Sequence, residues 1–283
     1  MSSPPSPGAV APPQGADLDP PSTLAGALRV FEYCLLTYRR TWRGSVVSSF
    51  LNPALFLLAM GVGLGSLVDK GHTSGATASL GNVTYLQYLA PGLLAATLMQ
   101  IAAFECTYPV MAAIKWVRTY FAMLASPVGV AGIVLGRFLW VAARLLMTAV
   151  IFVVVMALFG AVESVEIVWA IPVSVLTGLA YAGPITAFAA TRENDAAFAG
   201  LFRFVIMPMF LFSGTFFPIS QLPPVLRPLA YVTPLWHGVT LCRQLAFGHA
   251  TAVGVVSHCG YLLAWTLVGL ALAVVTHRRR LVV

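Results

Sequence analysis

The chain has 283 residues, of which 59% are hydrophobic and 9% are charged, and it carries a formal net charge of +7. Soluble domains have about 25% charged residues, and several apolar runs here exceed the roughly 18 residues that cross the hydrocarbon core of a bilayer. The composition therefore excludes a soluble globular protein and predicts an all-α integral membrane protein. The basic residues form short clusters at the ends of the apolar runs. This pattern is typical of membrane topology and argues against a nucleic-acid partner.

Residues 1–23 form a polar, proline-rich start to the chain. They contain seven prolines and lack both the basic start and the apolar centre of a secretory signal peptide. We expect a disordered cytoplasmic tail.

Residues 24–44 have the periodicity of an amphipathic helix. Arginines lie on one face, and the other face is apolar: Leu24, Ala27, Leu28, Phe31, Cys34, Leu35, Tyr38 and Trp42. Such a helix is suited to the membrane interface. The alternative is a cytosolic helix packed on a soluble domain, but the sequence offers no such domain.

Residues 45–283 are predicted to form one domain with six membrane spans. The expected spans are 45–68, 86–111, 130–159, 167–190, 197–217 and 252–276. Basic residues precede the first span, follow the sixth, and occur in the loops after the second and fourth spans, whereas the opposite loops contain few. The positive-inside rule then places both termini in the cytoplasm.

The residues between the last two spans are unusual for a membrane protein. Residues 212–234 contain five prolines, which remove backbone donors and restrict the preceding residues. Backbone of this kind is tolerated at a membrane only where protein or water satisfies its polar groups. We therefore expect a re-entrant hairpin on the extracytoplasmic side.

The motifs of common enzymes are absent from the sequence. Neither lysine, Lys70 nor Lys115, follows a glycine, so the chain has no phosphate-binding P-loop. The four aspartates do not cluster, which argues against a metal-dependent lipid transferase. The four cysteines are scattered, so metal or redox chemistry is not expected. A disulfide between Cys242 and Cys259 is open but not favoured.

Several short motifs carry a resemblance to type 2 ABC transporter permeases. The sequence resembles permeases of nodulation-type lipo-oligosaccharide exporters, with daunorubicin-type exporter permeases as close relatives, from about Leu24 to the C-terminus. The matching elements are Phe104–Tyr108 (FECTY), Met123–Pro127 (MLASP), Phe212–Pro218 (FSGTFFP), Leu222–Pro223, Pro234–Leu235 and Arg243.

The resemblance implies a permease subunit of an ATP-driven exporter in the inner (plasma) membrane. Such a subunit would pair with a second copy of itself, contact membrane lipids and be driven by a cytoplasmic ATP-binding cassette subunit. ATP and magnesium would bind to that partner, and this chain would bind no cofactor. The expected substrate is an amphiphile, either a lipid-linked saccharide, a lipo-oligosaccharide or a hydrophobic drug. The alternative is a proton-driven secondary transporter with Glu105 as the proton carrier.

Residues 112–128, between the second and third spans, form the first candidate site. Their alternating apolar and basic residues are consistent with a short surface helix. By resemblance this helix couples to the ATPase through Lys115, Trp116 and Arg118. An ordinary interfacial helix with its basic side chains reaching the lipid surface is the alternative.

Ionisable residues within the apolar runs form the second candidate site. A charge at the bilayer centre costs about 2.5–3.5 kcal/mol on insertion scales, so Glu105, Arg137 and Arg144 should face partners or water. Glu105 and Arg137 are predicted at similar depths, which favours an ion pair that locks two helices. A site for an anionic amphiphile is the alternative, and for Arg144 the two interpretations are equally open.

The outer hairpin is the third candidate site. Its aromatic residues could form an outer gate or an ordinary interfacial belt, and the two roles are compatible. The residues singled out are Phe216, Phe217, Pro218, Leu222, Pro223, Pro234 and Trp236, together with Tyr231.

Overall fold

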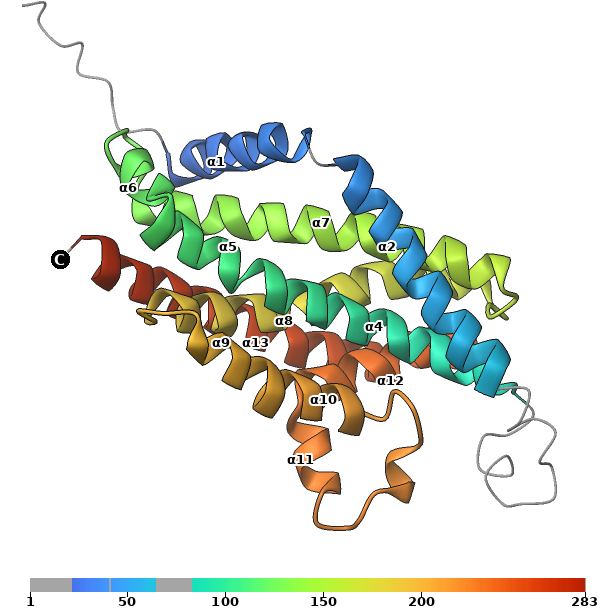
Figure 1. The fold of residues 1–283 in the computed structure, drawn as a ribbon. Coiled ribbons are helices and arrows are strands. Elements are labelled where there is room, and N and C mark those ends of the chain that lie inside the picture. Colours follow the sequence, from blue (N-terminus) through green and yellow to red (C-terminus); the bar gives the residue numbers. More distant parts are fainter. Residues whose placement is uncertain (1–21, 41, 65–82, 283) are drawn as a thin grey trace, which may run out of the picture.

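The computed structural model describes residues 22–40, 42–64 and 83–282, and this part of the chain is helical without strands. Nearly all of the predicted tail, the end of the first predicted span and Lys70 lie outside the described residues. Figure 1 shows long helices that run side by side in one bundle, with short helices at its edges.

The long helices follow the apolar runs of the sequence. They are α2 (Trp42–Phe56) with its continuation η1 (Leu57–Leu64), α4 (Tyr85–Glu105), α7 (Val130–Leu158), α8 (Ala170–Ala190) and α13 (Ala252–Leu281). Polar caps fix some of their starts. Thr84 and Gln87 form a capping box at α4, and the Thr251 hydroxyl accepts from the Gly254 amide at α13.

Among the described residues, five helical segments are long and apolar enough to cross a membrane: Trp42–Met60, Tyr85–Trp116, Val130–Leu158, Val165–Ala190 and Ala252–Leu281. They coincide with five of the six predicted spans. The remaining predicted span, 197–217, corresponds to the shorter apolar segment Ala196–Phe212. This segment comprises α9 (Ala196–Leu201), η4 (Phe202–Ile206) and α10 (Met207–Phe212). It ends early because residues 213–217 form bends rather than helix.

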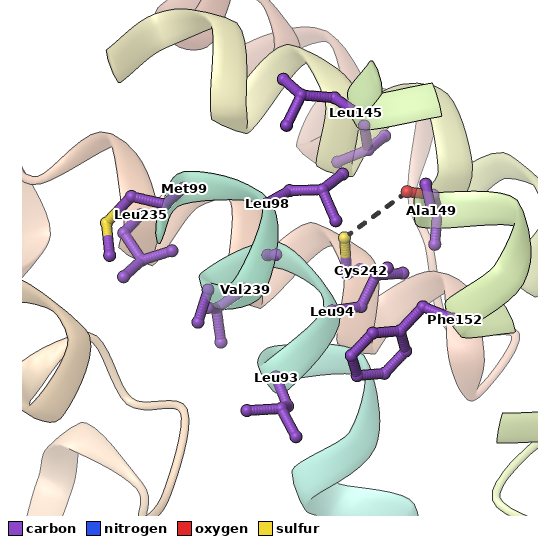
Figure 2. Packing of buried hydrophobic residues seen from close by; sticks show 14 of the residues in the cluster. Leu93, Leu94, Leu98, Met99, Leu145, Ala149, Phe152, Leu235, Val239 and Cys242 are labelled. Carbon is purple, nitrogen blue, oxygen red and sulfur yellow. Dashed lines mark hydrogen bonds between the residues drawn. The ribbon is translucent and has the colours of Figure 1, made fainter. Parts of the chain in front are cut away.

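Helix α8 lies at the centre of the bundle and contacts α4, α7, α12 (Pro234–Ala246) and α13. Small residues allow these close approaches. A Cβ added to Gly183 would lie 2.5 Å from the carbonyl carbon of Gly269, so α8 and α13 meet backbone to backbone. Apolar side chains supply no net hydrophobic force between helices in lipid, so close packing of this kind stabilises the bundle. Figure 2 shows the interdigitated side chains of the main buried cluster, which Leu94, Leu98 and Phe152 help to fill.

Helix α1 (Thr23–Tyr38) packs lengthwise along α7. Its contact face consists of small and medium side chains: a Cβ on Gly136 would lie 2.4 Å from the Ala27 carbonyl oxygen, and Val30 packs on the same glycine. Leu24 and Leu28, which belong to the predicted apolar face, are 65% and 52% exposed, so α7 does not cover that whole face. The helix also ends before Arg39, earlier than expected. Its position in the membrane interface remains a prediction.

Two connections and the C-terminus meet at one end of the bundle. Figure 1 shows α5 (Tyr108–Met111), α6 (Thr119–Leu124), the start of α9 and the C-terminus at the same end of the view. The predicted topology requires this arrangement, because both loops and the C-terminus are expected on one side. That this side is the cytoplasm remains a prediction.

Candidate functional site

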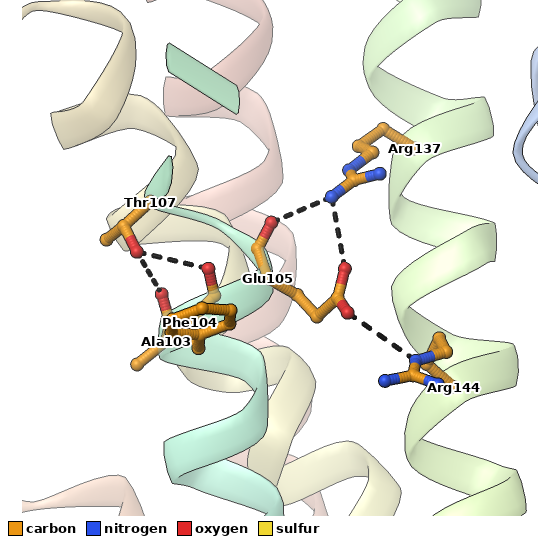
Figure 3. Close-up of polar contacts among 6 residues, drawn as sticks. All are labelled: Ala103, Phe104, Glu105, Thr107, Arg137 and Arg144. Atoms are coloured by element: carbon orange, nitrogen blue, oxygen red, sulfur yellow. Dashed lines mark hydrogen bonds and ion pairs between the residues drawn. The ribbon is translucent and has the colours of Figure 1, made fainter. Parts of the chain in front are cut away.

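The candidate site begins with a three-residue charge cluster between α4 and α7 (Figure 3). The Arg137 Nη2 atom lies 3.1 Å from Glu105 Oε2 and donates to the Glu105 carbonyl oxygen at 2.9 Å. That carbonyl is free to accept because α4 ends at Glu105. The expected ion pair between Glu105 and Arg137 is therefore present.

Arg144 contacts the other oxygen of the same carboxylate. Its Nε atom lies 3.5 Å from Glu105 Oε1, and its guanidinium lies over the Tyr38 ring at 4.8 Å from the centroid. The side chains of Glu105, Arg137 and Arg144 are only 15–16% exposed. Sequence reasoning gave Arg144 no partner, although the seven-residue spacing from Arg137 placed both arginines on one face of α7. The cluster holds two guanidinium groups for one carboxylate, which leaves a formal charge of +1.

Glu105 and Arg144 also line a cavity. This cavity has a volume of about 880 Å³ and lies between α2, α4, α7 and the segment Ala196–Phe212. Its apolar wall includes Leu55, Ile101 and Phe202, and its polar residues are Asn52, Thr97, Gln100, Glu105, Arg144, Thr148 and Arg203. Volumes of 300–1,000 Å³ are usual for small-molecule sites.

The second cavity, of about 330 Å³, lies beneath α1. It is lined by Cys34 and Tyr38 of α1, by Tyr120 of α6, and by Glu105 and Arg137. The charge cluster therefore separates two cavities and forms part of both walls. Because Tyr38 also contacts Arg144, α1 is linked to the cluster.

The predicted coupling segment, 112–128, is not one short surface helix. The helical run of α4 and α5 continues as η2 (Ala112–Trp116), and α6 follows after Arg118. Arg118 has a φ of 59°, a left-handed conformation that separates the two helical pieces. Trp116 and Val117 are 56% and 68% exposed, so this end of the bundle presents an accessible apolar surface with basic residues beside it.

A glutamate that sequence reasoning did not single out joins this segment to two others. Glu193 lies in the loop after α8, and its Oε2 atom is 3.5 Å from Lys115 Nζ. Lys115 also donates a hydrogen bond to the Glu193 carbonyl oxygen. The Glu193 carboxylate forms a second ion pair with Arg280, near the end of α13. The Arg280 guanidinium, with a smaller contribution from Lys115, holds the pKa of the Glu193 carboxyl below its ordinary value. Only the sign pattern of the loop charges could have suggested this contact.

The hairpin aromatics pack into two groups. Phe216 contacts Phe210 edge-on at 5.0 Å and Phe56 at 6.2 Å between ring centroids. Trp236, in α12, contacts Tyr231 edge-on at 4.7 Å. The sequence-predicted aromatics therefore do not form one cluster, because they contact different helices.

The other hairpin residues shape the turn. Leu222 is buried against Ile219 and Ala230, and Phe217 packs on that cluster. The prolines mark element boundaries: Pro218 caps η5 (Ile219–Gln221), Pro223 follows it, and Pro234 is the first residue of α12. Helix α11 (Arg227–Val232) lies between these points.

Arg243 holds the hairpin against α4 rather than acting as a free loop base. Its Nε donates to the Tyr88 carbonyl at 3.2 Å, its Nη2 donates to the Gly214 carbonyl at 3.0 Å, and its guanidinium lies 3.8 Å from the Tyr88 ring centroid. His237 and His258 join α12 to α13 through their Nδ1 atoms, 2.8 Å apart. The sequence analysis had assigned neither contact.

The cysteines are separate in this arrangement. Cys34, Cys106, Cys242 and Cys259 are all free thiols. Cys242 is buried, whereas Cys259 is partly exposed.

The long apolar helices, the charge cluster between two of them and the folded hairpin define a multi-pass membrane transport subunit, and the chain belongs to the ABC-2 type transporter family, whose model matches residues 28–247. It is 31% identical over 246 residues to Nodulation protein J of Rhizobium meliloti (strain 1021), a match that covers 87% of this chain and 90% of the relative. It is 32% identical over 247 residues to Nodulation protein J of Rhizobium leguminosarum bv. trifolii, covering 85% and 89%. Membership makes the chain the membrane subunit of an ABC transporter, not an enzyme, and implies an ATP-binding cassette partner.

Proposed function

We propose that this chain is the permease subunit of an ATP-driven exporter that moves an amphiphile out of the cell. The observation that carries the proposal is the 880 Å³ cavity, whose wall combines the charged residues Glu105, Arg144 and Arg203 with apolar side chains from α2, α4 and the segment Ala196–Phe212. A site with both kinds of wall suits a molecule with a polar head and an apolar tail. ATP and magnesium belong to the partner subunit in this proposal.

The proposed arrangement is a homodimer in the inner membrane with six spans per chain, both termini in the cytoplasm and the hairpin re-entrant from outside. The exposed Trp116 and Val117, together with Lys115 and Arg118, are the proposed contact for the ATP-binding subunit. Glu193 supports this contact because it ties Lys115 to Arg280, and so joins the coupling segment to the last span.

The proton-driven alternative depends on Glu105 as a carrier. A proton taken up by Glu105 would disrupt ion pairs with both Arg137 and Arg144 in every cycle. Breaking a poorly solvated ion pair is strongly unfavourable. The geometry therefore favours the ATP-driven function.

Co-purification tests the partner. The tagged permease is expected to retain a P-loop ATPase from its native membrane, and Lys115→Glu with Arg118→Glu should reduce the amount retained, because charges at an interface tune association. Arg278→Glu with Arg279→Glu changes the same charge at the same end of the bundle and is the matched control. Equal retention by the coupling variant and wild type would place the docking surface elsewhere, and absence of any ATPase would contradict the proposed function.

A further inference from the structure

The 880 Å³ cavity carries more positive than negative charge. Among its described lining residues, Arg144 and Arg203 are cations and Glu105 is the single carboxylate. Arg137 adds a third guanidinium because it binds the same carboxylate from the other side. The poorly exposed cluster of Arg137, Arg144 and Glu105 keeps a formal surplus of +1, and the exposed Arg203 adds a further positive charge to the cavity wall.

The internal ion pairs do not remove this surplus. Both oxygens of Glu105 are already engaged, Oε2 by Arg137 and Oε1 by Arg144. Figure 3 shows the Arg144 guanidinium extending from α7 toward α4, where the cavity lies. Buried or partly buried charges in proteins are normally compensated. An anion that enters the cavity would match the positive charge that Glu105 leaves over.

The rest of the wall shows what kind of group it is. The lining also includes the polar residues Asn52 and Gln100 and the apolar residues Leu51, Leu55, Ile101, Phe104, Phe202 and Met207. An inorganic anion would satisfy the arginines but leave the apolar part of the cavity unmatched. A neutral amphiphile would fill the apolar part but bring no negative charge to the positively charged part of the wall. Arginine also binds phosphate and carboxylate in a bidentate manner.

We propose that this cavity binds an amphiphile through an anionic head group, a phosphate, sulfate or carboxylate, held by Arg144 and Arg203, with its apolar chain along α2 and the segment Ala196–Phe212. The proposal deepens the proposed function, on which it rests for the substrate interpretation: the exported amphiphile is an anion. The same head-group chemistry could also come from a resident anionic phospholipid of the membrane.

Binding to the purified permease alone tests the site without the ATPase. The probes are a fluorescent lysophosphatidylglycerol and a fluorescent monoacylglycerol with the same acyl chain, titrated in micelles of a neutral maltoside detergent. Wild type is expected to bind the anionic probe about ten-fold more tightly than the uncharged one, the equivalent of one good charge-assisted contact. Arg203→Gln should abolish most of this preference while leaving the weaker binding of the monoacylglycerol unchanged.

Two further variants serve as a charge-retaining replacement of Arg144 and as a control outside the cavity. Arg144→Lys retains the charge and should retain part of the preference even if Arg144→Gln fails to fold. Arg279→Gln removes an exposed arginine distant from the cavity lining and should bind like wild type. Equal affinity of wild type for the two probes, or an unchanged preference in Arg203→Gln, would overturn the proposal.

The source of the anion is decided in the complete complex. In nanodiscs with the ATP-binding subunit, a transported anion leaves the cavity during ATP turnover, whereas a resident phospholipid stays bound. Either outcome supports the anionic site. If the permease prefers the anionic probe but does not release it during ATP turnover, only the proposed export function is contradicted. If the complex transports with ATP but shows no preference for the anionic probe, only the anionic site is contradicted.

Discussion

At the residue scale, the sharing of Glu105 by two arginines is the feature with the clearest energetic consequences. If the cluster locks α4 to α7, removing a single partner leaves uncompensated charge in a poorly hydrated site. The three residues are not equivalent, however. Loss of Arg137 leaves the pair between Glu105 and Arg144, whereas loss of the carboxylate leaves two cations close together.

The expected result is therefore an asymmetric double-mutant cycle. Glu105→Gln should lower the free energy of unfolding by about 3–5 kcal/mol, Arg137→Gln should lower it by less, and the double variant should regain part of the loss. The melting temperature of the purified protein is measured in each case, with Arg39→Gln, an exposed arginine after α1, as the control. Additive losses would show that the pair does not act as a lock. Normal stability with lost transport in Arg137→Gln would favour a substrate contact instead.

Glu193 provides a pH-dependent prediction at the same scale. The pKa of Glu193 is lower in the folded state than its ordinary value of 4.5. Its contribution to stability is therefore fully present above pH 4.5 and is lost as the pH falls through the folded-state pKa. Hydrogen exchange of the amides around Lys115 should accelerate in Glu193→Gln at pH 7, and the difference from wild type should vanish in acid. The difference should also shrink at high salt, because these charges are exposed. Identical exchange in the two proteins at pH 7 would mean that the contact does not order the segment.

At the element scale, glycine contacts set how closely the helices approach. Gly183→Ala should destabilise the bundle by about 1–3 kcal/mol, since its Cβ would lie 2.5 Å from the Gly269 backbone and the helices would have to separate. The matched control is Gly260→Ala in α13, the helix that Gly183 of α8 contacts, because nothing lies within 4 Å of the Cβ added at Gly260. Helix propensity should make that control neutral or slightly stabilising. A melting temperature equal to wild type for Gly183→Ala would mean that the crossing is looser than described.

The elements also show which features the sequence could predict. The positions of α4, α7, α8 and α13 followed from apolar length and agree with the predictions to within a few residues at most ends. The sequence did not predict which helix α1 packs on: Ala27 and Val30 pack against Gly136 of α7. Periodicity identifies an apolar face but not the helix that covers it. Similarly, the loop charges predict a topology, but the distances from Glu193 to Lys115 and Arg280 depend on the tertiary fold.

At the scale of the whole molecule, the proposed function depends on which end of the bundle faces the cytoplasm and on the energy source of transport. The loop after α4 and α5, the loop after α8 and the C-terminus lie at one end of the bundle, and Glu193 links all three. The concentration of arginine at this end favours the cytoplasmic side. The hairpin and the start of α13 would then lie toward the outside.

Cysteine labelling tests this sidedness. Arg279→Cys should react with an impermeant maleimide only after the membrane is opened, whereas Val225→Cys, exposed in the hairpin, should react in intact cells. Both are placed in a Cys259→Ser background, because Cys259 is the native thiol that is not buried. Labelling of Arg279→Cys from outside would invert the topology.

The most direct test of the central claim is the energy source of transport. Inside-out vesicles that contain the permease and its ATP-binding partner are given fluorescent lysophosphatidylglycerol, and its uptake is followed with ATP or with an imposed proton gradient. The account predicts uptake that requires ATP, is blocked by orthovanadate and is unaffected by a protonophore. Uptake that a proton gradient drives without ATP, and that Glu105→Gln abolishes, would contradict it.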